Sequence, residues 1–371
     1  MTHVLISILG LALLFVILRS MIRITLMNRH HRDFFAVVTG RAVYKAVAIR
    51  LGRKLDAQDT HSVLLWLFPA YMLSLIIMYF VGAMTAFVLL YWGTGAVSTW
   101  SQAFLASGSA LNTLGFATPT DSIGQWIAIP EGALGLGIVV FLFTFIPSYQ
   151  AVIRSREDRT SWLYVRTGNE PSGVTLLEWS KRAGIAGNMG DVWEAWEDWF
   201  RMLGDTHSVL PILTMSPSVQ SGQSWVSAAA SVLDAATLTT SSLETNDTEA
   251  ARTCVQTGTR ALLAIADALG WTRSDSAPAG TGPSREKYEA ARARLCSLGM
   301  RLKLVADQET QWREFQRMRE QYEDALFFVA RRTFAPLAGS LAAEVGLRDS
   351  SRPLRWKSTR RFVCHAKKKQ L

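Results

Sequence analysis

Residues 99–121 have the sequence TWSQAFLASGSALNTLGFATPTD, which separates two long apolar stretches and contains no Lys or Arg. Residues 99–112 are too few to cross a bilayer, but they suffice for about three helical turns. Irregular backbone at membrane depth is tolerated only where it lines a water-filled path or is buried in protein. The stretch therefore predicts a short helix and an extended Thr-Leu-Gly-Phe segment that dips into a membrane between two spans.

Three apolar stretches predict membrane-spanning helices: 4–18 (extendable to 27), 63–92, which contains no charged residue, and 123–149, whose one ionisable residue is Glu131. The second has length to spare for a hydrocarbon core of about 30 Å, and the first reaches that length when it is extended to residue 27. The alternative for the first stretch is a cleaved signal peptide, which needs a basic region before the apolar run and a small-residue cleavage site after it. Here the basic residues follow the run, so we expect a retained anchor.

Basic residues concentrate on one side of these spans. Between residues 19 and 54 the one acidic residue is Asp33. The basic residues there are Arg19, Arg23, Arg29, Arg32, Arg41, Lys45, Arg50, Arg53 and Lys54. Arg154, Arg156 and Arg159 follow the third span, whereas residues 93–122 hold only Asp121 as a charged residue. The positive-inside rule then predicts a multi-pass membrane protein with the N-terminus and residues 93–122 outside and with residues 28–62 and the C-terminal half in the cytoplasm.

The order of span, short helix, Thr-x-Gly-aromatic segment and span resembles the tetrameric potassium-channel superfamily of pore-loop channels. The form is that of the small bacterial two-helix pores, here with an extra N-terminal helix. The segment "NTLGFATP" is similar to the family's T-T-V-G-Y-G-D. The resemblance places Thr113, Leu114, Gly115, Phe116 and Ala117 in a selectivity filter whose carbonyl oxygens replace an ion's hydration shell. It also implies a homotetramer, because one chain supplies one filter segment.

The resemblance assigns supporting roles to four more residues. Asn112 precedes the filter, Glu131 would brace the pore helix by hydrogen bonding, Gly135 would allow close helix packing or a gating bend, and Pro147 would lie near a cytoplasmic constriction. Ala117 replaces the second filter glycine, and a Cβ costs about 1 kcal/mol or more if that residue needs positive φ. Thr118 replaces an acidic residue at the outer mouth. We therefore expect conduction of K⁺ or another monovalent cation, with selectivity left open.

The remainder predicts a soluble helical domain. Residues 28–62 form a basic linker, either an amphipathic helix on anionic lipid or a loop that sets topology. After a linker at 151–175, helical periodicity appears at 191–203, 224–238, 250–270, 285–302 and 308–332, interrupted by a loop at 272–284. The basic tail 352–371 suits anionic lipid or a solvated chain. We expect Asp234 and Asp267 to pair with Arg260 or Arg313, and His207 to lie in a polar loop or a helix cap.

Several functional classes find no support in the sequence. The chain has 371 residues, a net charge of +9 and three cysteines. These cysteines are far apart, without metal-ligand spacing, so we expect reduced thiols and no metal site or cofactor. No catalytic constellation, phosphate-binding loop or dinucleotide fingerprint is present, and the positive charge beside apolar spans indicates topology rather than nucleic acid.

The sequence thus predicts an all-α membrane protein divided into an N-terminal anchor (1–27), a basic linker (28–62), a pore domain (63–150) and a cytoplasmic helical domain (151–371). The predicted function is a potassium-channel-like cation channel that is gated or assembled through the cytoplasmic domain. Two alternatives remain. One is a non-conducting membrane scaffold with a degenerate pore loop, and the other is an ordinary loop that happens to contain Thr-x-Gly-Phe.

Overall fold

The computed structural model describes residues 2–26, 33–51, 57–272, 284–303, 308–335 and 337. Most of the predicted loop 272–284, the tail 352–371, and His30 and His31 of the basic linker lie outside the described residues. Every regular element within them is a helix, and the one β-feature is an isolated antiparallel bridge between Leu243 and Leu302. The predicted all-α class is confirmed for this part of the chain.

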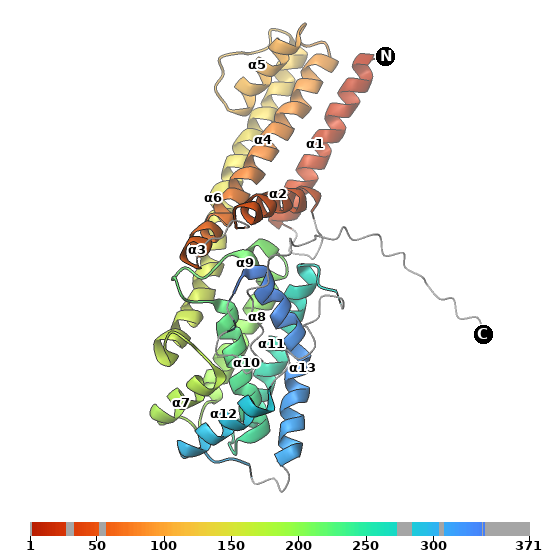
Figure 1. The fold of residues 1–371 in the computed structure, drawn as a ribbon. Coiled ribbons are helices and arrows are strands. Elements are labelled where there is room, and N and C mark those ends of the chain that lie inside the picture. Colours follow the sequence, from red (N-terminus) through yellow and green to blue (C-terminus); the bar gives the residue numbers. More distant parts are fainter. Residues whose placement is uncertain are drawn as a thin grey trace, which may run out of the picture.

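The described residues form thirteen helices in an elongated arrangement (Figure 1). Helices α1, α4 and α6 run side by side in one half, with α5 at its far end, next to the N-terminus. Helices α7 to α13 form a bundle in the other half, and α2 and α3 lie between the halves. The bounds are α1 Thr2–Leu26, α2 Phe34–Leu51, α3 Ala57–Leu65, α4 Leu67–Gly93, α5 Trp100–Leu111, α6 Ser122–Thr167, α7 Gly173–Arg182, α8 Gly190–His207, α9 Pro211–Met215, α10 Trp225–Ser242, α11 Thr248–Ala268, α12 Arg285–Ser297 and α13 Gln308–Thr333.

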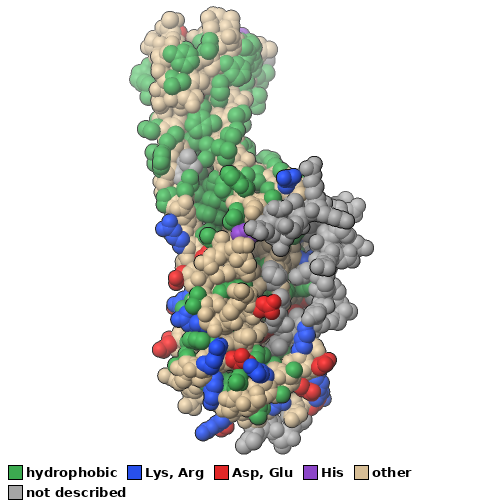
Figure 2. Space-filling view, turned by 60° about the vertical axis from the view of Figure 1, so that its left-hand side comes forward, with side chains coloured by type: hydrophobic (Ala, Val, Ile, Leu, Met, Phe, Trp, Pro, Cys, Tyr) green, Lys and Arg blue, Asp and Glu red, His purple; other side chains and the backbone are tan. Residues whose placement is uncertain are grey.

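Among the described residues, three helical segments are long and apolar enough to cross a membrane: Thr2–Arg23, His61–Gly93 and Ser122–Thr167. They contain the three predicted spans. Figure 2 shows hydrophobic side chains dominating the half that these segments build, whereas Lys, Arg, Asp and Glu gather over the bundle. This segregation is what a chain with one half in lipid and the other in water requires.

Small residues let α1 pack closely along α4. A Cβ on Gly10 would lie 2.9 Å from the carbonyl oxygen of Ala86, and one on Gly82 would lie 2.9 Å from Cδ1 of Ile17. Near the other end of the contact, the hydroxyl of Tyr79 donates a hydrogen bond of 2.8 Å to Oγ of Ser20. Close backbone approach and buried polar contacts are the usual means of joining helices in lipid, where apolar area alone gives no driving force.

Helix α6 is longer than the sequence indicates. We predicted a linker over residues 151–175, and this prediction is wrong, because α6 continues to Thr167, where Gly168 ends it with φ 86°. The charged residues 154–159 belong to a helix with two different faces. Arg156, Thr160 and Leu163 are fully buried against the bundle, while Arg154 and Asp158 are exposed. Pro147 lies within the helix and does not end it.

The bundle surrounds α10, all of whose residues are buried. Helices α6, α7, α11 and α13 contact it from different sides. Five helices of the bundle were predicted, and all are confirmed with shifted ends. The largest shift is in α12, which stops at Ser297 because Gly299 turns the chain with φ 73°. Helices α7 and α9 were not predicted.

A buried ion pair joins the centre of the bundle to α13. Asp234 of α10 pairs with Arg319, and the hydroxyl of Tyr322 donates a further hydrogen bond of 3.0 Å to the same carboxylate oxygen. Arg319 also reaches Glu323 at 3.3 Å. We predicted that Asp234 pairs with Arg260 or Arg313, and this prediction is therefore wrong. Arg313 is six residues before Arg319 on α13, and it pairs with Glu309 at the surface.

Removal of one member of this pair leaves the other charge buried, which typically costs about 3–5 kcal/mol, whereas apolar replacement of both members is much less harmful. We therefore expect Asp234→Leu to lower the free energy of unfolding of the bundle by that amount, and the double variant Asp234→Leu/Arg319→Met to recover most of the loss. Urea unfolding of the detergent-solubilised protein, followed by tryptophan fluorescence, measures both. The control Arg313→Met should change little, and a double variant as unstable as the single one would contradict the assignment.

Candidate functional site: the α5–α6 loop and its link to the bundle

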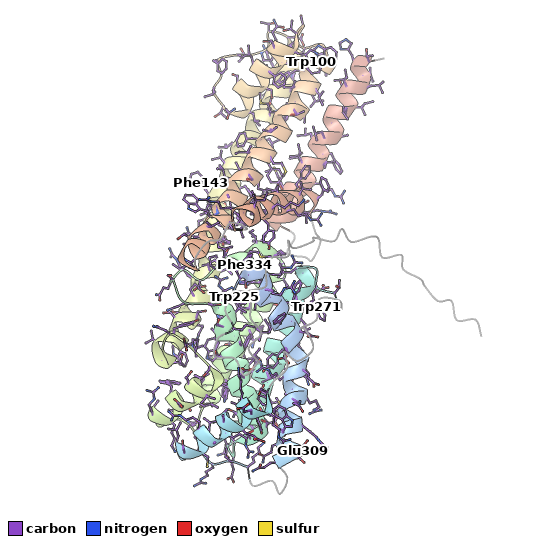
Figure 3. All side chains as sticks on the ribbon, viewed as in Figure 1. Trp100, Phe143, Trp225, Trp271, Glu309 and Phe334 are labelled. Atoms are coloured by element: carbon purple, nitrogen blue, oxygen red, sulfur yellow. The ribbon has the colours of Figure 1, made fainter. Side chains whose placement is uncertain are left out.

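The half that contains the three candidate membrane-spanning segments, with α1, α4, α5 and the first part of α6, is called the membrane half below. Helix α5 lies at its end away from the bundle, where Trp100 marks the start of the helix (Figure 3). It begins because Oγ1 of Thr99 accepts a hydrogen bond from the main-chain amide of Gln102, which caps the first turn. It ends at Leu111, two residues before Thr113, the first residue of the predicted filter. The predicted short helix at 99–112 is confirmed, while its insertion into a membrane remains a prediction.

Glu131 joins three helices at the back of α5. Its Oε1 accepts a hydrogen bond of 2.5 Å from Oγ of Ser107 on α5, and its Oε2 accepts one of 2.9 Å from the hydroxyl of Tyr91 on α4. Glu131 itself is fully buried on α6. A buried carboxyl group needs such partners, so this cluster fixes α5 relative to both long helices. The contact needed for bracing exists, and its role in a pore stays a prediction.

Gly135 lies where α6 crosses the end of α5. A Cβ built on it would lie 1.8 Å from the carbonyl oxygen of Leu111, so only glycine allows this crossing. One turn earlier, Gly132 faces the carbonyl oxygen of Ala110, with a Cβ distance of 3.4 Å. Gly137, by contrast, has nothing within 4 Å of its would-be Cβ. At Gly135 the structure thus shows close packing, the first of the two uses that the sequence left open.

The loop that follows α5 is anchored through its main-chain amides. The amide of Leu114 donates to the carbonyl oxygen of Ser109 at 2.8 Å, and the amide of Ala117 donates to Oγ of the same serine at 3.0 Å. Thr113 and Gly115 have positive φ, of 56° and 72°. Ala117 does not, so the Cβ penalty considered for it does not arise.

The carbonyl oxygens of the same loop are differently placed. Among the hydrogen bonds between described residues, none is accepted by a main-chain oxygen of residues 112–118. Leu114 and Phe116 are 65% and 66% exposed within the single chain, and Asn112, Thr113 and Gly115 are exposed as well. The loop therefore turns its donors toward its own helix and leaves its acceptors available for an external cation or donor.

A groove of about 300 Å³ separates this loop from α6. Ser109, Thr113 and Ala117 line one side, and Ile129 and Gly132 line the other. Pro147 is not near this site, because it lies twelve residues, about 18 Å, beyond Gly135 along α6. The structure thus places Asn112, Glu131 and Gly135 close to the five predicted filter residues. It places Pro147 toward the bundle.

The segment around α9 connects the membrane half with the bundle, and it was not predicted from the sequence. The hydroxyl of Tyr149 on α6 donates to Oγ of Ser216 at 2.5 Å, and its ring stacks on Phe68 of α4. Nε2 of His61 on α3 donates to the carbonyl oxygen of Ser218 at 2.8 Å. Pro211, which suits the first turn of a helix, was the available signal, but a helix of five residues gives no periodicity.

Arg156 fastens α6 to the same segment. Its guanidinium is fully buried and donates hydrogen bonds to the carbonyl oxygens of Leu213 and Pro217, at 3.0 and 3.1 Å, and it forms an ion pair with Glu157. It also lies over the ring of Trp225, which Figure 3 shows in the part of the bundle nearest the membrane half. The part of α6 around Arg156 is therefore held by several charge-assisted contacts.

His207 is buried beside this guanidinium, so the predicted polar loop or helix cap is wrong. Its Nδ1 lies 2.8 Å from Oγ1 of Thr206, whose own hydrogen goes to the carbonyl oxygen of Met202, and its Nε2 lies 3.4 Å from Nη1 of Arg156. A neutral imidazole that is protonated at Nδ1 satisfies both contacts. Burial, followed by the positive charge of Arg156, holds the pKa of His207 well below its usual range.

Comparison of the chain with protein-family models, with curated proteins and with solved structures found no match. Within the described residues, no group of three or more His, Cys, Asp or Glu side chains is arranged to hold a metal ion. The site is therefore described by its own geometry, and the absence of metal, cofactor and enzyme activity stays a prediction.

The contrast between two neighbouring glycines gives a first test of this geometry. Gly135→Ala should lower the free energy of unfolding by at least about 2 kcal/mol, because its Cβ overlaps the backbone of α5. Gly137→Ala should be neutral or stabilising by up to about 1 kcal/mol, because alanine is the better helix former. Thermal unfolding and size-exclusion chromatography of both variants measure this difference. Equal destabilisation by the two would contradict the close crossing.

The buried histidine gives a second test. Because the folded pKa of His207 is depressed, its contribution to stability is complete above the ordinary pKa near 6.5 and is lost as the pH falls and the unfolded chain binds a proton. Between pH 7 and 5.5 the unfolding free energy of the wild type should fall by about 1 kcal/mol more than that of His207→Gln. Chemical unfolding across this range measures the two profiles. Parallel profiles would contradict a neutral buried His207.

Proposed function

We propose that the protein is a potassium-channel-like channel for monovalent cations, assembled as a homotetramer in the bacterial inner membrane. One observation carries the proposal. Between two candidate membrane helices, a short helix is followed by a loop whose amides are anchored within the chain while its carbonyl oxygens are not. In a tetramer, carbonyl oxygens from Thr113 to Ala117 of four loops would surround one axis and replace the hydration shell of a dehydrated ion.

Helix α5 adds an electrostatic reason for cation preference. Its last residue, Leu111, directly precedes the loop, so the negative end of its helix dipole is directed at the site. No Lys or Arg lies between residues 93 and 122 to oppose a cation, and Asp121 is the one charged residue there. Four such helix ends around an axis favour a cation over an anion.

An exposed apolar stripe along α6 supplies a surface for assembly. It consists of Trp126, Ile129, Leu136, Val140 and Phe143, all between 55% and 74% exposed in the single chain. Figure 3 shows Phe143 at the end of this stripe nearer the bundle. Such a surface can be covered by lipid or by a neighbouring subunit. In the proposed tetramer, neighbouring subunits would contact this stripe near the groove between the loop and α6.

The proposed orientation places the N-terminus and α5 outside and the bundle in the cytoplasm, in keeping with the basic residues that flank the spans on the bundle side. Gating or assembly would then act through α6, which runs without interruption from the loop to the Arg156 contacts. Pro147 lies between these ends, where a constriction would control access to the passage.

Flux through proteoliposomes tests the proposal. Gly115→Asp should lower thallium flux at least about tenfold. It would place a side chain and a charge on the axis of the proposed tetramer while leaving the fold unchanged. Gly95→Asp is a matched control, since Gly95 also has positive φ and open space around its would-be Cβ, but it lies in the turn between α4 and α5. Both variants carry the same backbone strain of about 1–2 kcal/mol.

Wild-type tetramers should conduct, Gly95→Asp tetramers should conduct, and Gly115→Asp tetramers should not. Native mass spectrometry verifies the tetramer in each preparation. Folded wild-type tetramers without flux under any applied voltage would favour the scaffold alternative, and a monomer or dimer would rule out the proposed passage altogether.

A further inference from the structure

A second pocket, of about 260 Å³, lies at the opposite end of the membrane half from the pore loop. It is formed where the end of α1 meets the beginning of α2, and it has a basic side, an apolar side and a polar floor. Arg19 and Arg23 form the basic side, Val16, Phe34 and Phe35 the apolar side, and Ser20 and Asp33 the floor. Nothing in the proposed conduction mechanism uses this pocket.

The two arginines are arranged to bind one anion. They are four residues apart on α1 and therefore lie on the same face, one turn from each other. Neither forms an ion pair with a described residue, and both retain access to solvent. Two guanidinium groups at this spacing offer the planar pairs of donors that match the oxygens of a phosphate.

Asp33 is the acidic residue among those that line this pocket, but its Oδ1 is engaged in other contacts. Its Oδ1 accepts a hydrogen bond of 2.8 Å from Oγ of Ser20, and others from the amides of Phe35 and Ala36 at the start of α2. Ser20 is itself buried and bonded to Tyr79 of α4. Asp33 thus fixes the walls of the pocket, and the two arginines against one carboxylate leave a net positive charge.

The apolar side selects among phosphate-bearing ligands. Phe34 is 72% exposed and Val16 is 45% exposed, beside charged groups that would lie at a membrane surface. Arginines directly after the apolar run of α1 place their guanidinium groups at the level of lipid headgroups. A ligand with both a phosphate and an acyl chain fits these two sides together, whereas a free phosphate leaves the apolar side uncovered.

From this geometry we propose that the pocket binds the headgroup of an anionic phospholipid, such as phosphatidylglycerol, from the leaflet facing the bundle. The guanidinium groups of Arg19 and Arg23 hold the phosphate, and Phe34 and Val16 contact the upper part of an acyl chain. The proposal rests on the membrane insertion of α1 and α4 and is independent of ion conduction.

Lipid retention tests the proposal without any measurement of flux. The full-length protein is equilibrated with phosphatidylglycerol and phosphatidylcholine, extracted in detergent, and examined by native mass spectrometry. The wild type should retain about one phosphatidylglycerol per chain, in preference to phosphatidylcholine. Arg19→Gln/Arg23→Gln should lose it, with apparent affinity reduced by about fivefold or more per arginine. The control Arg50→Gln/Arg154→Gln removes two exposed charges elsewhere and should retain the lipid.

A second variant, Phe34→Ser, distinguishes a lipid site from a site for free phosphate. It also serves as the test if the double arginine variant fails to fold. Phe34→Ser should weaken retention of phosphatidylglycerol, and 10 mM inorganic phosphate should displace the lipid poorly from the wild type. Three outcomes would each overturn the proposal. One is equal lipid retention by the pocket and control variants, and another is equal retention of the two lipids. The third is full displacement of the lipid by inorganic phosphate together with no effect of Phe34→Ser.

Discussion

A main-chain oxygen in an apolar medium needs either a hydrogen-bond donor or a cation, and this requirement governs the membrane half of the protein. The helices satisfy it internally, but the loop after α5 does not. Its amides are bound to Ser109, which fixes the backbone, while the oxygens of residues 112–118 receive no donor from the described residues. If the loop lies at membrane depth, something outside the chain must compensate these oxygens. In the proposed tetramer a row of cations along the axis would do so, and this would account for a loop that is fixed through its amides alone.

The surroundings of the loop are consistent with that requirement. Glu131 receives hydrogen bonds from Ser107 and Tyr91, and Gly135 admits the end of α5 to contact distance with α6. Both contacts act on α5 rather than on the loop itself. A helix held in this way supplies a fixed end from which a short loop can project, so the positions of its oxygens depend on packing several residues away.

The sequence was sufficient for the features that repeat along the chain and insufficient for those that depend on single contacts. Long apolar runs predicted the three spans, and the Ser- and Ala-rich stretch predicted α5, because length and composition decide these elements. The charges near Arg156 suggested a linker instead of a helix, since a buried arginine looks like a solvated one until its carbonyl partners are known. For the same reason His207 was assigned to a polar loop or a helix cap, and Asp234 to the wrong arginines. At the predicted filter, the resemblance supplied the residues, but Ser109 as the anchor of the loop had no signal of its own.

Helix α6 is held by different kinds of contact at Gly135 and at Arg156, and this difference constrains how the bundle can act on the loop. At Gly135, α6 touches the backbone of α5 with no room for a side chain. If α6 slid along its own axis, larger residues next to Gly135 would therefore overlap with the end of α5. At Arg156 the helix is held by hydrogen bonds to two carbonyl oxygens of a short segment that also contacts α3 through His61. The same segment bonds to Tyr149 of α6, whose ring stacks on Phe68 of α4. A displacement of that segment would therefore tilt or bend α6 about the Gly135 contact rather than translate it. Pro147, which lacks one main-chain hydrogen bond, lies between the two and is where such bending costs least.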